Sequence, residues 1–181
     1  MAGAPELPMR NGCADWLYYN TDQWPFVRVD GRKCDAPDDQ MESRFEAHLH
    51  CFMTLLNANV PFVILFDIRG CNKFPARFLK PMADFLNMMK GKVAENLIGS
   101  AILLESLLVR GVLSMLFTFH APTRPCKVSH DENVATAWCQ QALRDPLHVT
   151  ASNTAANEFT PAEQAKMADG QASWRDTIEK M

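Results

Sequence analysis

The stretch Pro61-Phe-Val-Ile-Leu-Phe-Asp67 decides the fold of this chain of 181 residues. Its middle residues are all apolar, with no alternation of polar and apolar positions. A strand with one face in water alternates, whereas a strand covered on both faces reads as a continuous apolar run. The stretch therefore predicts a central strand of a sheet that is covered by helices on both faces.

On either side of this strand, strand patterns and helix patterns follow one another. Upstream, two short apolar strands are expected at residues 16–19 and 25–30, and an amphipathic helix runs from about residue 41 to 59. Downstream, helices are expected over 78–92, 107–119 and 130–144, with strands within 98–105 and at 126–129. This order predicts an α/β domain: a small open, mostly parallel or mixed five-stranded sheet flanked by helices.

Two local signals refine these elements. Pro81 lies inside the helical pattern of 78–92, so either the helix kinks there or a short turn precedes a helix that has Pro81 in its first turn. Ser129-His-Asp-Glu132 matches a capping box and marks the start of the last helix.

The chain divides into an N-terminal arm (1–15), a central domain (16–144) and a partly helical C-terminal arm (145–181). Both arms are rich in small and polar residues, which do not build a core by themselves. Buried aromatic residues carry most of the energy of protein interfaces. We therefore expect the arms to dock onto partners through a few apolar anchors: Trp16, Phe159, Trp174 and Ile178.

Composition excludes several classes of protein. The net charge of −3 lacks the basic excess typical of nucleic-acid binding. Residues 101–119 are mostly apolar but contain Glu105 and Arg110, and each charge costs roughly 2.5–3.5 kcal/mol at a bilayer centre, so no transmembrane span is expected. None of the six cysteines stands in a C-x-x-C pair, and no signal peptide is visible. These features predict free thiols and an intracellular, cytoplasmic protein. Association with the cytoskeleton or an organelle is left open.

Charged residues follow the strands and open the helices. Asp67 ends the central strand, at the carboxyl edge where open α/β sheets bind ligands. Four arginines are candidates to face the same edge and to hold an anion or a partner: Arg69, Arg77, Arg110 and Arg124. The alternative interpretation is that these groups pair with one another and satisfy charges near the core.

No recognisable catalytic or metal-binding motif is present. His48 and His50 are two residues apart and face different sides of one helix, whereas zinc on a helix needs histidines at i and i+4. Neither a Gly-x-Ser-x-Gly elbow nor a glycine-rich phosphate loop is found, so no cofactor and no metal are expected. The remaining enzyme hypothesis uses Asp67, or Cys71, whose pKa the neighbouring Lys73 and Arg77 would lower.

The order of elements resembles the STAS domain of anti-sigma-factor antagonists, and more closely its SpoIIAA-like branch, grouped with STAS/Sec14-type domains. The resemblance covers about residues 24–144 and rests on Pro61-Phe-Val-Ile-Leu-Phe-Asp67, Arg77-Phe-Leu-Lys-Pro-Met-Ala-Asp-Phe-Leu86, Ser100-Ala-Ile-Leu-Leu-Glu-Ser106, Arg110-Gly-Val-Leu and Pro122-Thr-Arg-Pro125. In the antagonists an Asp-Ser-Ser-Gly segment carries a phosphorylated serine; here Ala76 stands in the aligned segment and has no hydroxyl. The resemblance implies a non-enzymatic interaction module or a pocket for a small apolar ligand.

Two functional hypotheses follow. The first is an interaction or structural protein that docks to other proteins through its helix faces and arms, as a component of a larger assembly. Residues 35–46 are mainly acidic and residues 69–92 are mainly basic, and such separated charge suits electrostatic docking. The second is a small-molecule or lipid-binding module with a pocket beneath residues 107–119.

Overall fold

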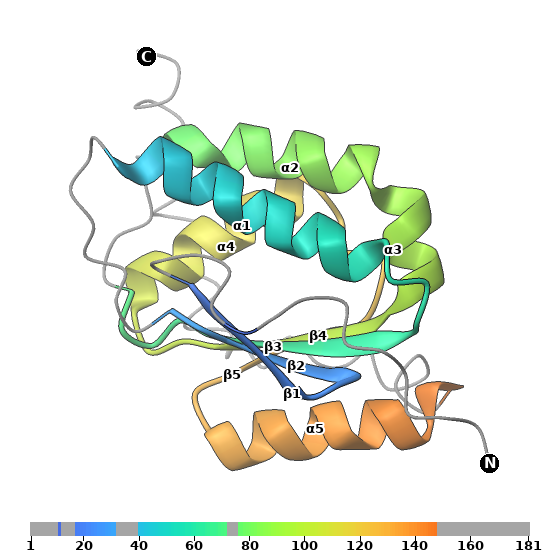
Figure 1. Cartoon of the computed structure of the whole chain (residues 1–181). Helices are drawn as coiled ribbons and strands as arrows, with labels where there is room; N and C mark the ends of the chain where they lie inside the picture. Colours follow the sequence, from blue (N-terminus) through green and yellow to red (C-terminus); the bar gives the residue numbers. More distant parts are fainter. Residues whose placement is uncertain (1–10, 12–16, 32–39, 72–75, 148–181) are drawn as a thin grey trace.

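The computed structural model describes residues 11, 17–31, 40–71 and 76–147, which form a sheet between two layers of helices (Figure 1). The strands are β1 (Tyr18–Gln23), β2 (Phe26–Asp30), β3 (Phe62–Asp67), β4 (Leu97–Leu103) and β5 (Cys126–Ser129). They lie side by side in this order, with β1 antiparallel to β2 and all other pairs parallel. The predicted α/β class and the mixed five-stranded sheet are confirmed.

The helices are distributed unequally over the two faces of the sheet. One face is covered by α1 (Met41–Leu56), α2 (Leu79–Met88), α3 (Lys90–Asn96) and α4 (Leu107–Phe119), with the short 3-10 turn η2 (Ala76–Phe78) before α2. Within the described chain, the opposite face is covered by α5 (Glu132–Arg144) alone (Figure 1). Each connection between neighbouring parallel strands therefore crosses the same face.

The central strand β3 is buried on both faces, as its continuous apolar run predicts. Phe62 and Ile64 belong to the core beneath α1, together with residues such as Leu55. Val63 and Leu65 point to the other side, into the core beneath α5. All four side chains have no exposed surface.

The structure differs from the expected helices at residues 78–92 and at the start of the last helix. The helix expected over 78–92 is two helices that meet at Met89, and Pro81 lies in the first turn of α2 after η2, which is the second of the two alternatives. The capping box that starts at Ser129 is wrong, because Asp131 is the N-cap residue of α5 and its Oδ1 accepts from the backbone N–H of Asn133 and Val134 at 2.8 and 3.2 Å.

The helix α4 is less deeply packed than its apolar sequence suggests. Its main neighbour is α2 rather than the sheet. Leu113 and Phe117 are half-buried, and Phe119 is 55 % exposed. Residues 107–119 are apolar on nearly every side, which predicts a helix packed deep in the fold. This prediction is wrong, because a cavity beneath α4 leaves part of its apolar surface uncovered.

Two of the cysteines form disulfide bonds, contrary to the sequence-based expectation. Cys51 and Cys71 are disulfide-bonded, so the expectation of free thiols is wrong for these two, while Cys126 and Cys139 are free. No helix in the described part of the chain is long and apolar enough to cross a membrane.

Asn11 of the N-terminal arm accepts a hydrogen bond from the backbone N–H of Thr21 at 2.7 Å. The anchors Trp16, Phe159, Trp174 and Ile178 lie outside the described residues.

Gly99 in β4 gives a test of the packing between the sheet and α5. A Cβ atom at this position would lie 2.8 Å from the ring of Trp138 and 3.2 Å from the carbonyl oxygen of Pro125. We expect Gly99→Ala to lower the free energy of unfolding by about 1–3 kcal/mol, because the ring and the backbone must both move. Denaturant unfolding measures this loss.

The matched control is Gly111→Ala in α4, where a Cβ would meet no atom within 4 Å. Alanine is favoured over glycine inside a helix by roughly 0.5–1 kcal/mol, so this variant should be more stable than the parent. If both substitutions stabilise the protein, the close contact between Gly99 and Trp138 is not present in solution.

Candidate functional site

At the carboxyl end of β3, the buried carboxylate of Asp67 is the centre of a network of four charged side chains. Arg28 of β2 donates from Nη2 to Asp67 Oδ2 at 2.8 Å, and Arg69 donates from Nη2 and Nε at 2.6 and 2.9 Å. Glu132 of α5 accepts from both arginines, at 2.6 and 2.7 Å. We call Arg28, Asp67, Arg69 and Glu132 the Asp67 network.

The network neutralises itself. Burial raises the pKa of Asp67, but the hydrogen bonds and charges of Arg69 and the charge of Arg28 outweigh it, so the pKa lies below its ordinary value. Hydrogen bonds from Arg28 and Arg69 likewise lower the pKa of Glu132. Among the described residues, two carboxylates face two guanidinium groups, so the charges of these four side chains balance. The arrangement joins β2, β3 and α5 and has the character of a structural ion-pair network.

The five predicted edge residues do not form one cluster. Asp67 and Arg69 are in contact, but Arg77 lies on η2 with its guanidinium 5.1 Å from the centre of the Phe78 ring. Arg110 is in the first turn of α4. Arg124 precedes β5 and donates to the carbonyl oxygen of Ala94, which places it at the opposite, amino edge of the parallel strands.

A cavity of about 220 Å³ lies between α4 and the sheet, and it is bounded by α1 and α2 as well. Its walls are mainly apolar and include Phe52, Ile64, Phe66, Met82, Leu86, Ile102, Leu113, Leu116 and Phe117. An engineered apolar cavity of about 150 Å³ stays dry and binds benzene. This space is larger and mainly apolar, so it can hold a compact apolar molecule.

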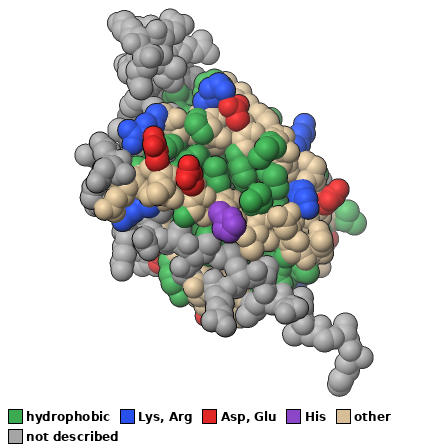
Figure 2. Space-filling view, turned by 45° about the horizontal axis from the view of Figure 1, so that its top comes forward, with side chains coloured by type: hydrophobic (Ala, Val, Ile, Leu, Met, Phe, Trp, Pro, Cys, Tyr) green, Lys and Arg blue, Asp and Glu red, His purple; other side chains and the backbone are tan. Residues whose placement is uncertain are grey.

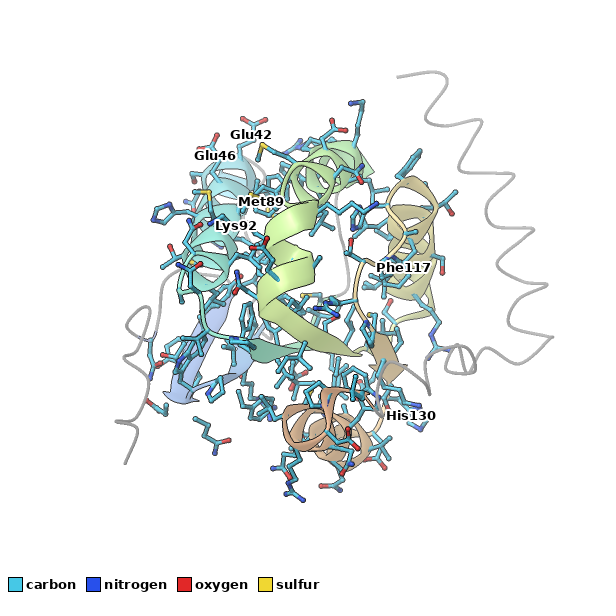
Figure 3. All side chains as sticks on the ribbon, turned by 90° about the vertical axis from the view of Figure 1, so that its right-hand side faces the viewer. Glu42, Glu46, Met89, Lys92, Phe117 and His130 are labelled. Atoms are coloured by element: carbon cyan, nitrogen blue, oxygen red, sulfur yellow. The ribbon has the colours of Figure 1, made fainter. Side chains whose placement is uncertain are left out.

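The cavity explains the exposure of α4. Leu113 and Phe117 of this helix pack against Ile102 and Val128 of the sheet and also line the space beside that contact, so part of the apolar surface of α4 faces the cavity. Figure 3 shows Phe117 on α4, with α3 beside it and the sheet below. The strands contribute the side chains that alternate away from α5, such as Ile64 and Ile102.

Two histidines lie in the wall of the cavity. His48 of α1 has its Nδ1 atom 2.6 Å from the hydroxyl of Tyr19, and burial lowers its pKa to about 4. His120, just after α4, has its Nδ1 atom 2.7 Å from Oδ1 of Asn87. Burial and the charge of Lys90 lower the pKa of His120. Both rings are therefore uncharged at neutral pH, which keeps the wall free of histidine charge.

Among the residues that the structure describes, no group of histidine, cysteine and acidic side chains is arranged to hold a metal ion. Cys71 is disulfide-bonded and offers no thiolate, which removes it as a nucleophile in this state. Comparison of the chain with protein-family models, with curated proteins and with solved structures finds no match. The resemblance to STAS domains therefore stays a prediction that rests on the sequence pattern.

Proposed function

We propose that this protein binds a small apolar molecule in the cavity beneath α4. The observation that carries the proposal is the cavity itself, about 220 Å³ of space with a mainly apolar wall. Pockets for small ligands are concave, mostly apolar and carry a few polar groups. Burial of apolar ligand surface in such a space is worth roughly 25 cal/mol per Å².

The energetic cost of an empty cavity supports the same conclusion. Cavities left by removed side chains destabilise a protein by about 24 cal/mol per Å³. The space beneath α4, about 220 Å³, is partly open to solvent, so only part of such a loss applies to it. A ligand of the right shape recovers part of this energy.

Binding of naphthalene, a compact and uncharged probe, tests the proposal. We expect naphthalene to raise the thermal unfolding midpoint of the full chain, because a ligand that binds only the folded state stabilises it. Leu113 lies in the cavity wall on α4, so Leu113→Trp should fill part of the space and weaken binding by roughly tenfold or more. Titration followed by naphthalene fluorescence measures the affinity directly.

The matched control is Val134→Trp, which places the same ring on α5, where Val134 is 45 % exposed and far from the cavity wall. This variant should bind naphthalene as the parent does. If the parent shows no binding, or if Leu113→Trp and Val134→Trp bind equally well, the cavity is not a ligand site.

A second proposal, docking to protein partners, is favoured by a specific surface. Figure 2 shows hydrophobic side chains gathered near the middle of the face formed by α1 and α2, with charged side chains around them. Leu49, Met53 and Met89 are only partly buried, and Met88 is 72 % exposed. Figure 3 shows two acidic residues of α1, Glu42 and Glu46, on the same layer as Lys92 of α3. Apolar patches rimmed by charge are typical of protein interaction sites.

Affinity purification from native material tests this second proposal. Partners recovered with the full chain should be lost with Met88→Ser and Met53→Ser combined, and kept with Val134→Ser on α5. The same experiment with a chain ending at Arg144 tests whether the C-terminal arm contributes. Identical partners in every case would exclude both the patch and the arm as the interface.

A further inference from the structure

The cavity has one polar end, formed by the segment that leads from α4 to β5. His120, Thr123 and Arg124 of this segment lie in its wall, together with Ser100 of β4. The other lining residues are almost all apolar, apart from His48 on α1. Polar lining is therefore concentrated at the amino edge of β4 and β5, opposite to the Asp67 network.

Two buried polar atoms at this end have no hydrogen-bond partner in the described part of the protein. They are Oγ1 of Thr123 and Nε of Arg124. Buried polar atoms are nearly always satisfied, and an unsatisfied one points to a ligand, water or ion that completes it. The two residues are adjacent in the chain and both line the same cavity, but Oγ1 and Nε are themselves buried, so a ligand group reaches them only when the side chains turn toward the cavity.

Arg124 also carries a positive charge that no acidic side chain of the described residues neutralises by an ion pair. The ion pairs found there involve Arg28, Arg69 and Lys80. The Nη2 atom of Arg124 donates to the carbonyl oxygen of Ala94 and holds the guanidinium in place against α3. A fixed guanidinium next to low-dielectric space favours an anion, and a carboxylate matches its planar donors.

Lys90 adds a second positive charge, besides that of Arg124, near this end of the cavity. Lys90 is close enough to lower the pKa of His120, which lies in the wall of the cavity. An anion at this end therefore gains from the positive charges of Arg124 and Lys90, while the uncharged ring of His120 adds neither attraction nor repulsion. The rest of the wall provides only apolar surface to the remainder of the ligand.

We infer that the ligand of the cavity is an apolar molecule with one terminal carboxylate, bound with its head at Thr123 and Arg124 and its apolar body beneath α4. This inference rests on the proposed function, of which it names the ligand class. Arg124 supplies the charge, Thr123 supplies a hydroxyl donor, and Leu113, Leu116 and Phe117 cover the apolar body. The carboxylate pairs with the charge of Arg124, which no acidic side chain among the described residues neutralises by an ion pair.

A pair of probes with the same chain, octanoate and 1-octanol, tests the inference by isothermal titration calorimetry at pH 7 on the full chain. Octanoate should bind roughly tenfold or more tightly than 1-octanol, because only octanoate offers a charge to Arg124. Arg124→Gln should weaken octanoate binding by at least roughly tenfold and leave 1-octanol within about twofold. Thr123→Val should weaken octanoate binding to a smaller extent in the same direction.

Retained binding of 1-octanol shows that the variants are folded and that their cavity is intact. Arg144→Gln removes the same charge from the exposed end of α5 and should leave both affinities unchanged. Equal binding of the two probes, or an equal loss of both in Arg124→Gln, would overturn the carboxylate inference and leave the proposed function standing. Failure of both probes and of naphthalene to bind would overturn the two together.

Discussion

Asp67→Ala is expected to lower the free energy of unfolding by about 3 kcal/mol, because removing one partner of a buried ion pair leaves the others uncompensated. The side chain of Asp67 has no exposed surface, and it accepts hydrogen bonds from Arg28 and Arg69. In the variant, Glu132 is the one acidic partner of both arginines that remains among the described residues, and its side chain is 40 % exposed. Denaturant unfolding at pH 7 measures the loss.

Asp84→Ala is the matched control for this prediction. Asp84 pairs with Lys80 at 2.6 Å within one helix, and both side chains are well exposed. An exposed pair of this kind contributes roughly 0.3–0.5 kcal/mol. The pH dependence gives a further check. Because folding lowers the pKa of Asp67 below its ordinary value of 3.8, its stabilising effect is complete well above that value and is lost as the pH falls through the lowered pKa. Equal stability of Asp67→Ala and Asp84→Ala would show that the Asp67 network does not stabilise the fold.

The buried ring of His48 should also lower the stability of the protein as the pH falls from about 6.5 to about 4, a range that lies above the one in which Asp67 titrates. Burial lowers its pKa to about 4, below the value of 6.5 in the unfolded chain. In this range the unfolded chain binds a proton that the folded chain does not, so stability is complete above pH 6.5 and decreases as the pH falls. Each pKa unit corresponds to about 1.4 kcal/mol, so the total is about 3 kcal/mol.

Unfolding measured from pH 7.5 to 4 separates His48 from the other groups. The double variant Tyr19→Phe, His48→Phe removes the titrating ring together with its hydrogen-bond partner, and its stability should vary less with pH in this range. His50→Phe, on the exposed side of the same helix, is the control and should keep the slope of the parent. His120 is present in all three proteins, so its own lowered pKa does not affect the comparison. An unchanged slope in the double variant would mean that His48 is accessible to protons in the folded state.

Much of the fold could be predicted, because the pattern of apolar residues along the chain indicates which side chains avoid water. The continuous run at residues 62–66 predicts a strand covered on both sides, and the structure has β3 over Phe62–Asp67. The last strand and the end of the last helix were also placed correctly, at Cys126–Ser129 and Arg144. These signals are local, since they depend on the spacing of neighbouring residues alone.

The candidate site could be predicted only in part, because its partners are distant in the sequence. Arg28 and Glu132 are 104 residues apart and meet through the parallel pairing of β2 with β3 and the position of α5. The sequence suggested a pocket beneath residues 107–119, but the same apolar pattern equally fits a helix packed tightly on the sheet. Periodicity shows that a side chain is sheltered from water and does not show whether its neighbour is another side chain or empty space.

The position of α5 has a consequence for synthesis of the chain. The four parallel strands and the helices that join them precede α5 in the sequence, so they leave the ribosome before it does. Until residues 132–144 have emerged, the sheet face that carries Val63, Leu65, Ala101 and Leu103 has none of the helix that covers it in the described structure. Exposed apolar surface on a growing chain promotes aggregation and binding by chaperones. Translation that stops before residue 132 should therefore give a product that is retained by chaperones, whereas a chain that extends through Arg144 can close this face.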